Sequence, residues 1–437
     1  MLAIVLGALA VGLLLWISHV SAQRVEEEMR QRNIPTTFAG WHNRAVADVD
    51  FVGDTGGALR DLMQDLPAID LKPLADGDAW KQFESQSPRL LVSLDKALLS
   101  PSLTFRLEAG SGPLQRNSQT NSLEHPEIER VDMLGQLLLL RIDHLTRQGR
   151  TDAAAAACVE LLKLSGYLRS LPDEQALAQM AKLRIAAAQA IERLINTATL
   201  TPPMLEQLKA AVEEAMTLRR TEDFRPWIDV RIVEAFVVID QPGQTPDVSD
   251  QQSPLGRYTP GMITLQSAEV IDAYLDLHRY IDDRGSLGDL SRRVALRRDR
   301  TPDISRPLAL AHRAALGDAY TPEHLVPDTA AAINLAVEAQ TRLTLVDLAL
   351  DIELYHYLHK QLPRSLVDLR RTEAADPYSD SSIRFTERKV SGQVSGGAGE
   401  SGQAYALRSA GFDGKFETND DVVFTREAPE RRSAIAR

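Results

Sequence analysis

The sequence predicts a mainly α-helical fold that ends in a small antiparallel β module. Three observations lead to this prediction. Ala and Leu dominate the chain, and both lose little side-chain freedom in helices. Aromatic residues make up only 5% of the chain. Apolar residues recur at helical spacing from about 125 to 220 and again over 329–361. After residue 380 the pattern changes to short runs that alternate between polar and apolar residues.

The N-terminal segment, residues 1–22, is expected to be a transmembrane anchor. Met1–Ile17 contains no charged side chain, and as a helix it would cover roughly 25 Å of a hydrocarbon core about 30 Å thick. Ser18–Ala22 can complete the crossing, and Trp16 occupies an interfacial position. A cleaved signal peptide is the alternative, because Val20-Ser21-Ala22 fits a signal-peptidase site before Gln23.

Residues 23–240 are expected to form a helical domain of consecutive antiparallel helices. The first contains Val131–Ile142 and ends near Gly149, which can adopt a left-handed C-cap. Thr151 is expected to cap the second helix, the third follows Pro172-Asp173, and Thr201-Pro202 starts the fourth. No 34-residue repeat is visible, so an irregular helical bundle is favoured over a helical-hairpin array.

The rest of the chain divides into three segments. Residues 241–262 hold Pro242, Pro246, Pro254 and Pro260 and read as a linker. Residues 263–361 form a second helical region, whose long helix is apolar on most faces and therefore central. In the tail, 362–437, we expect strands at 382–386, 404–408 and 422–424, with a Gly- and Ser-rich loop at 391–403.

The tail carries an ordered set of motifs. A long helix ends in Tyr355–Pro363, and Asp376-Pro377-Tyr378, Tyr405–Phe416 and Glu417–Asp421 follow. Over about 340–425 this order resembles the C-terminal module of a type II secretion major pseudopilin. The whole chain also resembles a group of bacterial membrane-anchored helical proteins that carry the same tail. The resemblance implies a small sheet and a calcium-binding acidic loop.

The chain departs from the pseudopilin pattern in several ways, one of which is the long helical stretch between the N-terminal segment and the tail. The N-terminus has no prepilin cleavage motif, and the turn at Asp376 lacks the usual glycine.

Membrane orientation also has two interpretations. Arg24, Arg30 and Arg32 follow the apolar segment, so the positive-inside rule favours a cytoplasmic bulk. The resemblance implies the opposite, and we therefore expect the bulk of the chain to be extracytoplasmic, or periplasmic.

Calcium is the one cofactor that the sequence suggests. Its predicted ligands, Asp413, Asn419, Asp420 and Asp421, fall within nine residues, and Ca²⁺ prefers six to eight hard oxygen ligands. Ser409 and Thr418 could add further oxygens. The alternative is a solvated acidic turn in which Gly414 takes a positive φ.

Other constellations favour structural roles. Glu353, His356 and His359 share one helix face without a matching pair elsewhere, and Cys158, the only cysteine, lies in an apolar stretch. A basic segment should form a solvated helix face; it consists of Arg292, Arg293, Arg297, Arg298 and Arg300.

The functional expectation follows from charge and motifs together. A formal net charge of −12 repels nucleic-acid phosphates, and no nucleophile elbow, phosphate loop or metalloprotease motif is visible. We expect a membrane-anchored interaction or scaffold protein without its own catalysis, which binds the membrane through its N-terminal helix and also binds a protein partner. The alternatives are an extracytoplasmic hydrolase-type enzyme and a pseudopilin-like secretion or assembly subunit.

Overall fold

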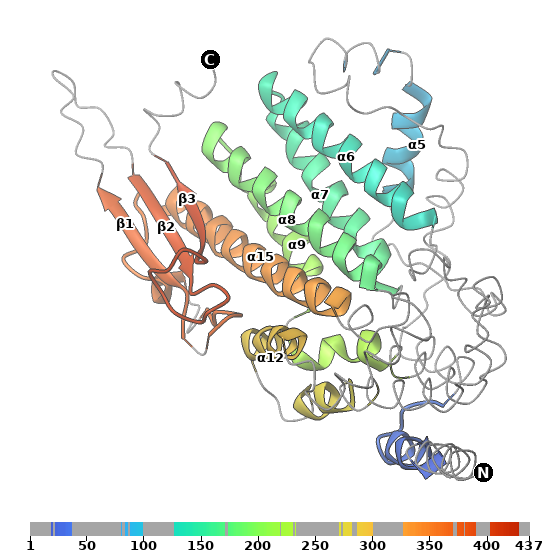
Figure 1. Ribbon diagram of the computed structural model, residues 1–437. Helices are drawn as coiled ribbons and strands as arrows, with labels where there is room; N and C mark the ends of the chain where they lie inside the picture. Colours follow the sequence, from blue (N-terminus) through green and yellow to red (C-terminus); the bar gives the residue numbers. More distant parts are fainter. Residues whose placement is uncertain are drawn as a thin grey trace, which may run out of the picture.

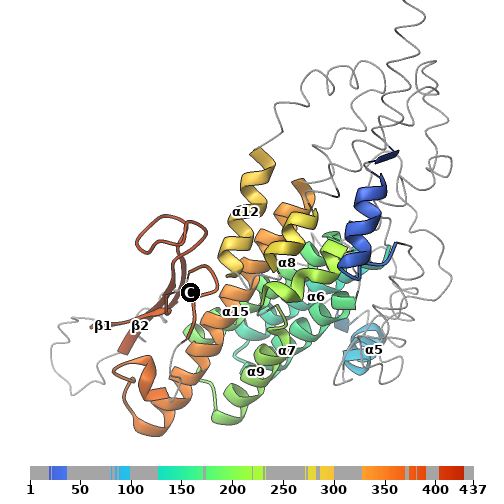
Figure 2. The ribbon, with the colours of Figure 1, turned by 90° about the horizontal axis from the view of Figure 1, so that it is seen from below.

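The computed structural model confirms a mainly helical fold with a small C-terminal antiparallel sheet (Figure 1). Its successive layers are the sheet, the long helix α15, the pair α8 and α9, and then α7 and α6 (Figure 2). The residues that the structure describes are 19–20, 22–36, 80, 84–85, 88–98, 126–170, 174–218, 220–229, 232, 271, 274–281, 286–299, 327–369, 374–379, 381–389 and 403–427.

The helical body is built from consecutive helices, as the sequence predicts. α7 packs against α6, α8 and α9, while α15 from the second half of the chain covers α8 and α9. An irregular bundle therefore describes the body better than a linear array of hairpins. The helices of the body are α5 (Pro88–Leu98), α6 (Pro126–Arg147), α7 (Thr151–Tyr167), α8 (Glu174–Thr197) and α9 (Pro202–Ala215).

The turn between α6 and α7 confirms one cap and corrects another. Gly149 has φ +69°, and its N–H and that of Arg150 donate to the carbonyls of Thr146 and Leu145, which is a Schellman motif. Arg150 is then both the last residue of this motif and the N-cap of α7. The expectation that Thr151 caps α7 is wrong, because the tight turn places Thr151 inside the helix.

The helix α15 (Pro327–His359) is central, as expected from its apolar residues on most faces. It contacts α8, α9, α12 (Leu287–Asp299) and the sheet. Leu343, Leu348 and Ile352, on different sides of the helix, are all fully buried. The residues of α15 therefore belong to one hydrophobic core with those of the helical body and the tail.

The sheet has the strand order β1 (Arg384–Lys389), β2 (Gln403–Ser409) and β3 (Val422–Arg426), all antiparallel. It is fastened to α15 because the Tyr405 hydroxyl donates to Glu353 at 3.1 Å and Arg426 pairs with Glu353 at 2.6 Å. Side chains of α8 cover the outer edge of β3. Glu192 accepts the Thr425 N–H, and Asn196 donates to the Thr425 carbonyl, so this edge is closed to further strand pairing.

The segment after the expected anchor is helical over 22–31 and packs onto the body. Val25 and Met29 are fully buried, and Glu28 forms an ion pair with Arg279. The charges of Gln23–Arg32 alone would suggest a fully solvated helix, but the burial of Val25 and Met29 shows that only part of it is solvated. Residues 1–18 of the anchor expected at 1–22 lie outside the described residues, as does the linker expected at 241–262. Among the described helices, none combines the length and apolar character that a bilayer crossing requires.

Candidate functional site: the acidic loop of the C-terminal module

The acidic loop, residues 410–421, connects β2 to β3 through a glycine-dependent turn. Gly411 has φ +66°, and a Cβ at this position would lie 2.2 Å from the Asp420 carbonyl oxygen. Gly414 has φ +72°, as expected for the turn. The two glycines allow the chain to fold back on itself, and the aspartates on either side of the turn consequently face one another.

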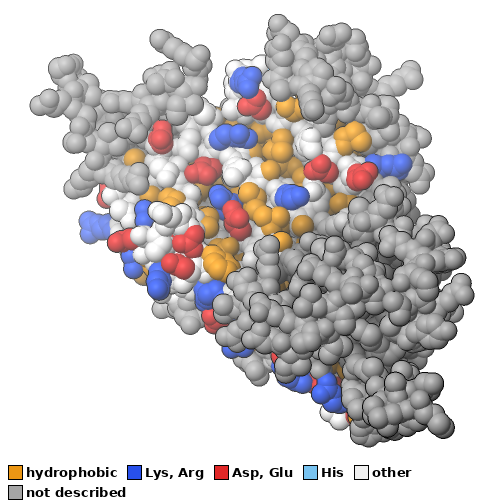
Figure 3. All heavy atoms as spheres, in the orientation of Figure 1, with side chains coloured by type: hydrophobic (Ala, Val, Ile, Leu, Met, Phe, Trp, Pro, Cys, Tyr) orange, Lys and Arg blue, Asp and Glu red, His pale blue; other side chains and the backbone are white. Residues whose placement is uncertain are grey.

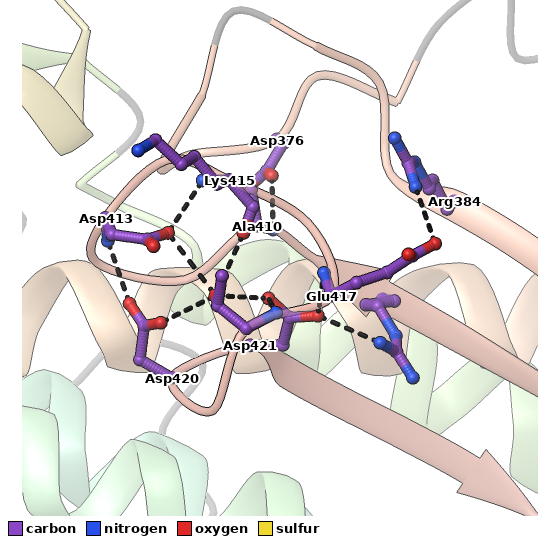
Figure 4. A network of polar contacts seen from close by, with 10 residues as sticks. Asp376, Arg384, Ala410, Asp413, Lys415, Glu417, Asp420 and Asp421 are labelled. Carbon is purple, nitrogen blue, oxygen red and sulfur yellow. Dashed lines mark hydrogen bonds and ion pairs between the residues drawn. The ribbon is translucent and has the colours of Figure 1, made fainter.

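Three of the four predicted calcium ligands converge on one hydroxyl group (Figure 4). The Thr418 Oγ1 lies 2.7 Å from Asp420 Oδ1, 3.1 Å from Asp421 Oδ1 and 3.4 Å from Asp413 Oδ1. The Lys415 carbonyl oxygen is a further 3.1 Å neighbour. A hydroxyl has a single proton to donate, so several acceptor oxygens share one donor at this point.

Each of these carboxylates also has a donor outside that cluster. The Asp413 N–H donates to Asp420 at 2.8 Å, and the Lys415 N–H donates to Asp413 at 2.7 Å. Asp421, whose side chain is 3% exposed, accepts from the Glu417 N–H and pairs with Arg408 at 3.0 Å. The carboxylates of the loop are therefore held by its own backbone N–H groups and by Arg408.

Burial and hydrogen bonding have opposite effects on the pKa of Asp420. Partial burial acts to raise this pKa, but hydrogen bonds from the Asp413 N–H and the Thr418 hydroxyl outweigh burial. The pKa of Asp420 is therefore lowered, and the carboxylate is ionised at neutral pH. Ionised carboxylates and a backbone carbonyl are the oxygen types that Ca²⁺ selects.

The remaining predicted ligands lie apart from this cluster. Asn419 is exposed on the same turn and takes no part in the hydrogen bonds around Thr418. Ser409 donates to Asp376 at 2.6 Å instead, so its hydroxyl belongs to the support beneath the loop. Within the described part of the chain, no three His, Cys, Asp or Glu side chains are placed to hold a metal ion.

That support is the buried carboxylate of Asp376, a role that sequence reasoning missed. Asp376 is 3% exposed and accepts four hydrogen bonds. Their donors are the Tyr378 N–H at 3.0 Å, the Ser379 hydroxyl at 3.0 Å, the Ser409 hydroxyl at 2.6 Å and the Ala410 N–H at 2.8 Å. The Asp-Pro-Tyr turn is thereby joined to the first residue of the acidic loop.

The helix α12 clamps the same turn from the other side. The Gly288 N–H donates to the Pro377 carbonyl at 2.9 Å. Arg292 donates to the carbonyls of Tyr378 and Phe412 at 3.1 and 3.2 Å. Arg292 therefore connects the helical body to the acidic loop, which differs from the solvated role expected for the basic segment.

The other constellations have structural roles. The Glu353 carboxylate forms an ion pair with Arg426 and accepts a hydrogen bond from Tyr405. The ring of His359 contacts that of Tyr355 in a tilted arrangement, with ring centroids 4.2 Å apart. Burial raises the pKa of the Cys158 thiol to about 12. This cysteine therefore stays protonated and poorly nucleophilic at neutral pH.

Comparisons of the chain with protein-family models, curated proteins and solved structures found no match. The pseudopilin-like character of the tail therefore remains a prediction, which the geometry of the acidic loop allows us to test.

Millimolar calcium is expected to raise the melting temperature of the full-length protein if the acidic loop binds it. Ligand that binds only the folded state contributes about 2.7 kcal/mol at a hundredfold excess over Kd. Asp413→Asn and Asp420→Asn should each abolish the difference between calcium and chelator. Magnesium should substitute poorly, because it requires a tighter octahedral shell.

Glu417→Gln is the matched control, since it removes a charge from the same loop but outside the Thr418 cluster. Glu417 instead faces Arg384, at 3.5 Å. Identical melting of the wild-type protein in calcium and in chelator would identify the loop as a self-satisfied acidic turn.

Proposed function

We propose that this chain is a membrane-anchored, extracytoplasmic interaction or scaffold protein without catalysis of its own. The observation that carries the proposal is an exposed apolar tip, formed by the end of α15 and the 3-10 helix η6 (Leu366–Leu369). Leu358 is 73% exposed, Val367 65% and Tyr357 48%. Single exposed apolar residues are common, but a group of them at one projecting end is typical of a contact surface.

The tip contrasts with the rest of α15. Leu348, Ala349 and Ile352 are fully buried, whereas the exposed residues begin at Tyr357, closer to the end of the helix. Lys360 lies over the ring of Tyr357 at 4.6 Å, which leaves Leu358 as the most exposed side chain. Apolar surface of this kind favours a protein partner that presents apolar side chains of its own.

The surroundings of α15 favour a scaffold over a pseudopilin-like assembly subunit. The apolar faces of this helix are already covered by α8, α9, α12 and the sheet. Packing α15 against neighbouring subunits in a filament would require those contacts to separate, at the cost of exposing the core.

The docked N-terminal segment supports a body close to the membrane. Val25 and Met29 are buried in the core. A membrane anchor at 1–22 would therefore be followed by almost no free linker before the body. The visible body surface mixes Lys and Arg with Asp and Glu around apolar side chains (Figure 3). This pattern fits contacts with proteins better than binding to nucleic-acid phosphates.

Site-specific photo-crosslinking in cells tests the proposal. A photoreactive residue at Leu358 should give a discrete covalent adduct with an extracytoplasmic protein. Val367→Asp in the same chain should reduce that adduct about tenfold, as expected for loss of a contact that contributes ~1.4 kcal/mol. Melting should not change, because Val367 is exposed.

Position Val92 is the control, since it is 52% exposed on α5, in a different part of the body. The same adducts from positions 92 and 358, or an adduct insensitive to Val367→Asp, would argue against a specific interaction surface. A cytoplasmic partner would contradict the expected orientation.

A further inference from the structure

A buried arginine, for which the described residues supply no counter-ion, lies in the middle of the helical body. Arg184, on α8, is 2% exposed. Its Nε donates to the Ser165 hydroxyl at 3.3 Å and its Nη2 to the Thr217 hydroxyl at 3.2 Å. Among the residues that the structure describes, no carboxylate forms an ion pair with Arg184.

This arrangement is unusual because charges buried in proteins are normally paired. Two neutral hydroxyls accept hydrogen bonds from two of the five N–H groups of a guanidinium, but they do not neutralise its positive charge. Burial lowers the pKa of Arg184 to about 9, and the nearby charge of Arg169 acts in the same direction. Arg184 still carries its proton at neutral pH, so its charge is buried without a balancing negative charge among the described residues and is subject to the electrostatic repulsion of Arg169.

The two hydroxyl partners differ in what they can offer a ligand. Ser165 donates its proton to the Leu162 carbonyl at 2.6 Å and so accepts from Arg184. Thr217 accepts from Arg184, which leaves its own proton for another acceptor. Thr217 is half-buried and Arg169 is exposed, so the residues that accompany the buried guanidinium include groups that solvent reaches.

We propose that Arg184, Arg169 and the Thr217 hydroxyl form a binding site for a phosphate group, free or carried by a small metabolite. A phosphate carries a charge of about −1.5 to −2 at neutral pH, which would balance the two arginines. A carboxylate would balance only one of them. The planar guanidinium can also donate two parallel hydrogen bonds to two phosphate oxygens.

The first experiment measures binding to the full-length protein at constant ionic strength, with inorganic phosphate, glycerol phosphate and acetate as probes. Equilibrium dialysis with labelled phosphate gives the affinity, and thermal melting gives the linked stabilisation. Phosphate should bind saturably and raise the melting temperature, whereas acetate should have little effect. Tighter binding of glycerol phosphate than of inorganic phosphate would identify a phosphate ester as the preferred source, and the reverse order would identify the free ion.

Variants assign the effect to the site. Arg184→Met should abolish phosphate binding, and Arg169→Gln should weaken it roughly fivefold, the factor expected for one exposed charge. Arg193→Met is the matched control, because Arg193 is an exposed arginine on the same helix, and it should bind like the wild type.

Arg169→Gln keeps the test decisive if Arg184→Met fails to fold, since Arg169 is exposed. The proposal is overturned if the wild-type protein binds no phosphate. It is equally overturned if a folded Arg184→Met variant binds as the wild type does, or if Arg169→Gln and Arg193→Met weaken binding to the same extent.

Discussion

Asp376→Ala is expected to destabilise the folded protein by about 3–5 kcal/mol, the range for breaking a buried hydrogen-bonded charge network. The substitution leaves the buried Ser409 hydroxyl and the Ala410 N–H without the acceptor they have in the wild type. It also releases the Asp-Pro-Tyr turn from β2. Urea denaturation of the full-length protein measures the change in the free energy of unfolding.

Asp368→Ala provides the matched control for this prediction. Asp368 also accepts two backbone N–H groups, those of Arg364 and Ser365, but from an exposed position. Loss of such an exposed cap costs about 1 kcal/mol. Equal destabilisation by the two variants would show that burial of the Asp376 carboxylate contributes nothing, and would contradict its role as the support of the acidic loop.

Gly411→Ala is the second substitution with a large expected effect, about 3 kcal/mol or more. The positive φ alone costs roughly 1–2 kcal/mol for a residue with a Cβ. The new Cβ would also meet the Asp420 carbonyl oxygen at 2.2 Å, and this contact is with backbone that no rotamer change can relieve. The loop must open, so calcium stabilisation, where present, should be lost together with stability.

Two other glycines separate the contributions to that effect. Gly149 has φ +69°, but a Cβ added there would meet nothing within 4 Å, so Gly149→Ala should cost only the backbone strain, about 1–2 kcal/mol. Gly166 lies inside α7 with open space around it, so Gly166→Ala should stabilise by about 0.5–1 kcal/mol. Thermal and urea unfolding of the three variants measures these changes in stability. If Gly411→Ala lowered the free energy of unfolding no more than Gly149→Ala does, the steric argument would be wrong.

Only part of the geometry of the acidic loop could be predicted from local sequence. Asp413, Asp420 and Asp421 could be expected to meet, because a glycine turn separates them by only a few residues. The central position of Thr418 and the exposure of Asn419 depend on backbone angles, including the positive φ of Glu417, at +71°. A non-glycine residue in that conformation leaves no recognisable signal in the sequence.

The sequence by itself determined most of the secondary structure in the part of the chain that the structure describes. Helical periodicity over 329–361 corresponds to α15 at Pro327–His359, and the three alternating runs correspond to β1, β2 and β3. These features follow from local propensity and from the spacing of apolar residues, which act over one or two turns of helix or a few residues of strand.

Only the tertiary structure decided the roles of the charged side chains. Nothing in the sequence indicates that Asp376 supports the acidic loop or that Arg184 is buried. Arg292 stands in a basic segment that was expected to be solvated, yet it joins α12 to the acidic loop. Arg292 meets the Phe412 carbonyl from 120 residues away, and Arg184 meets Thr217 across 33 residues. Such pairings depend on how whole helices pack, and the free energy of burying a charge depends on every neighbour that the packing brings to it.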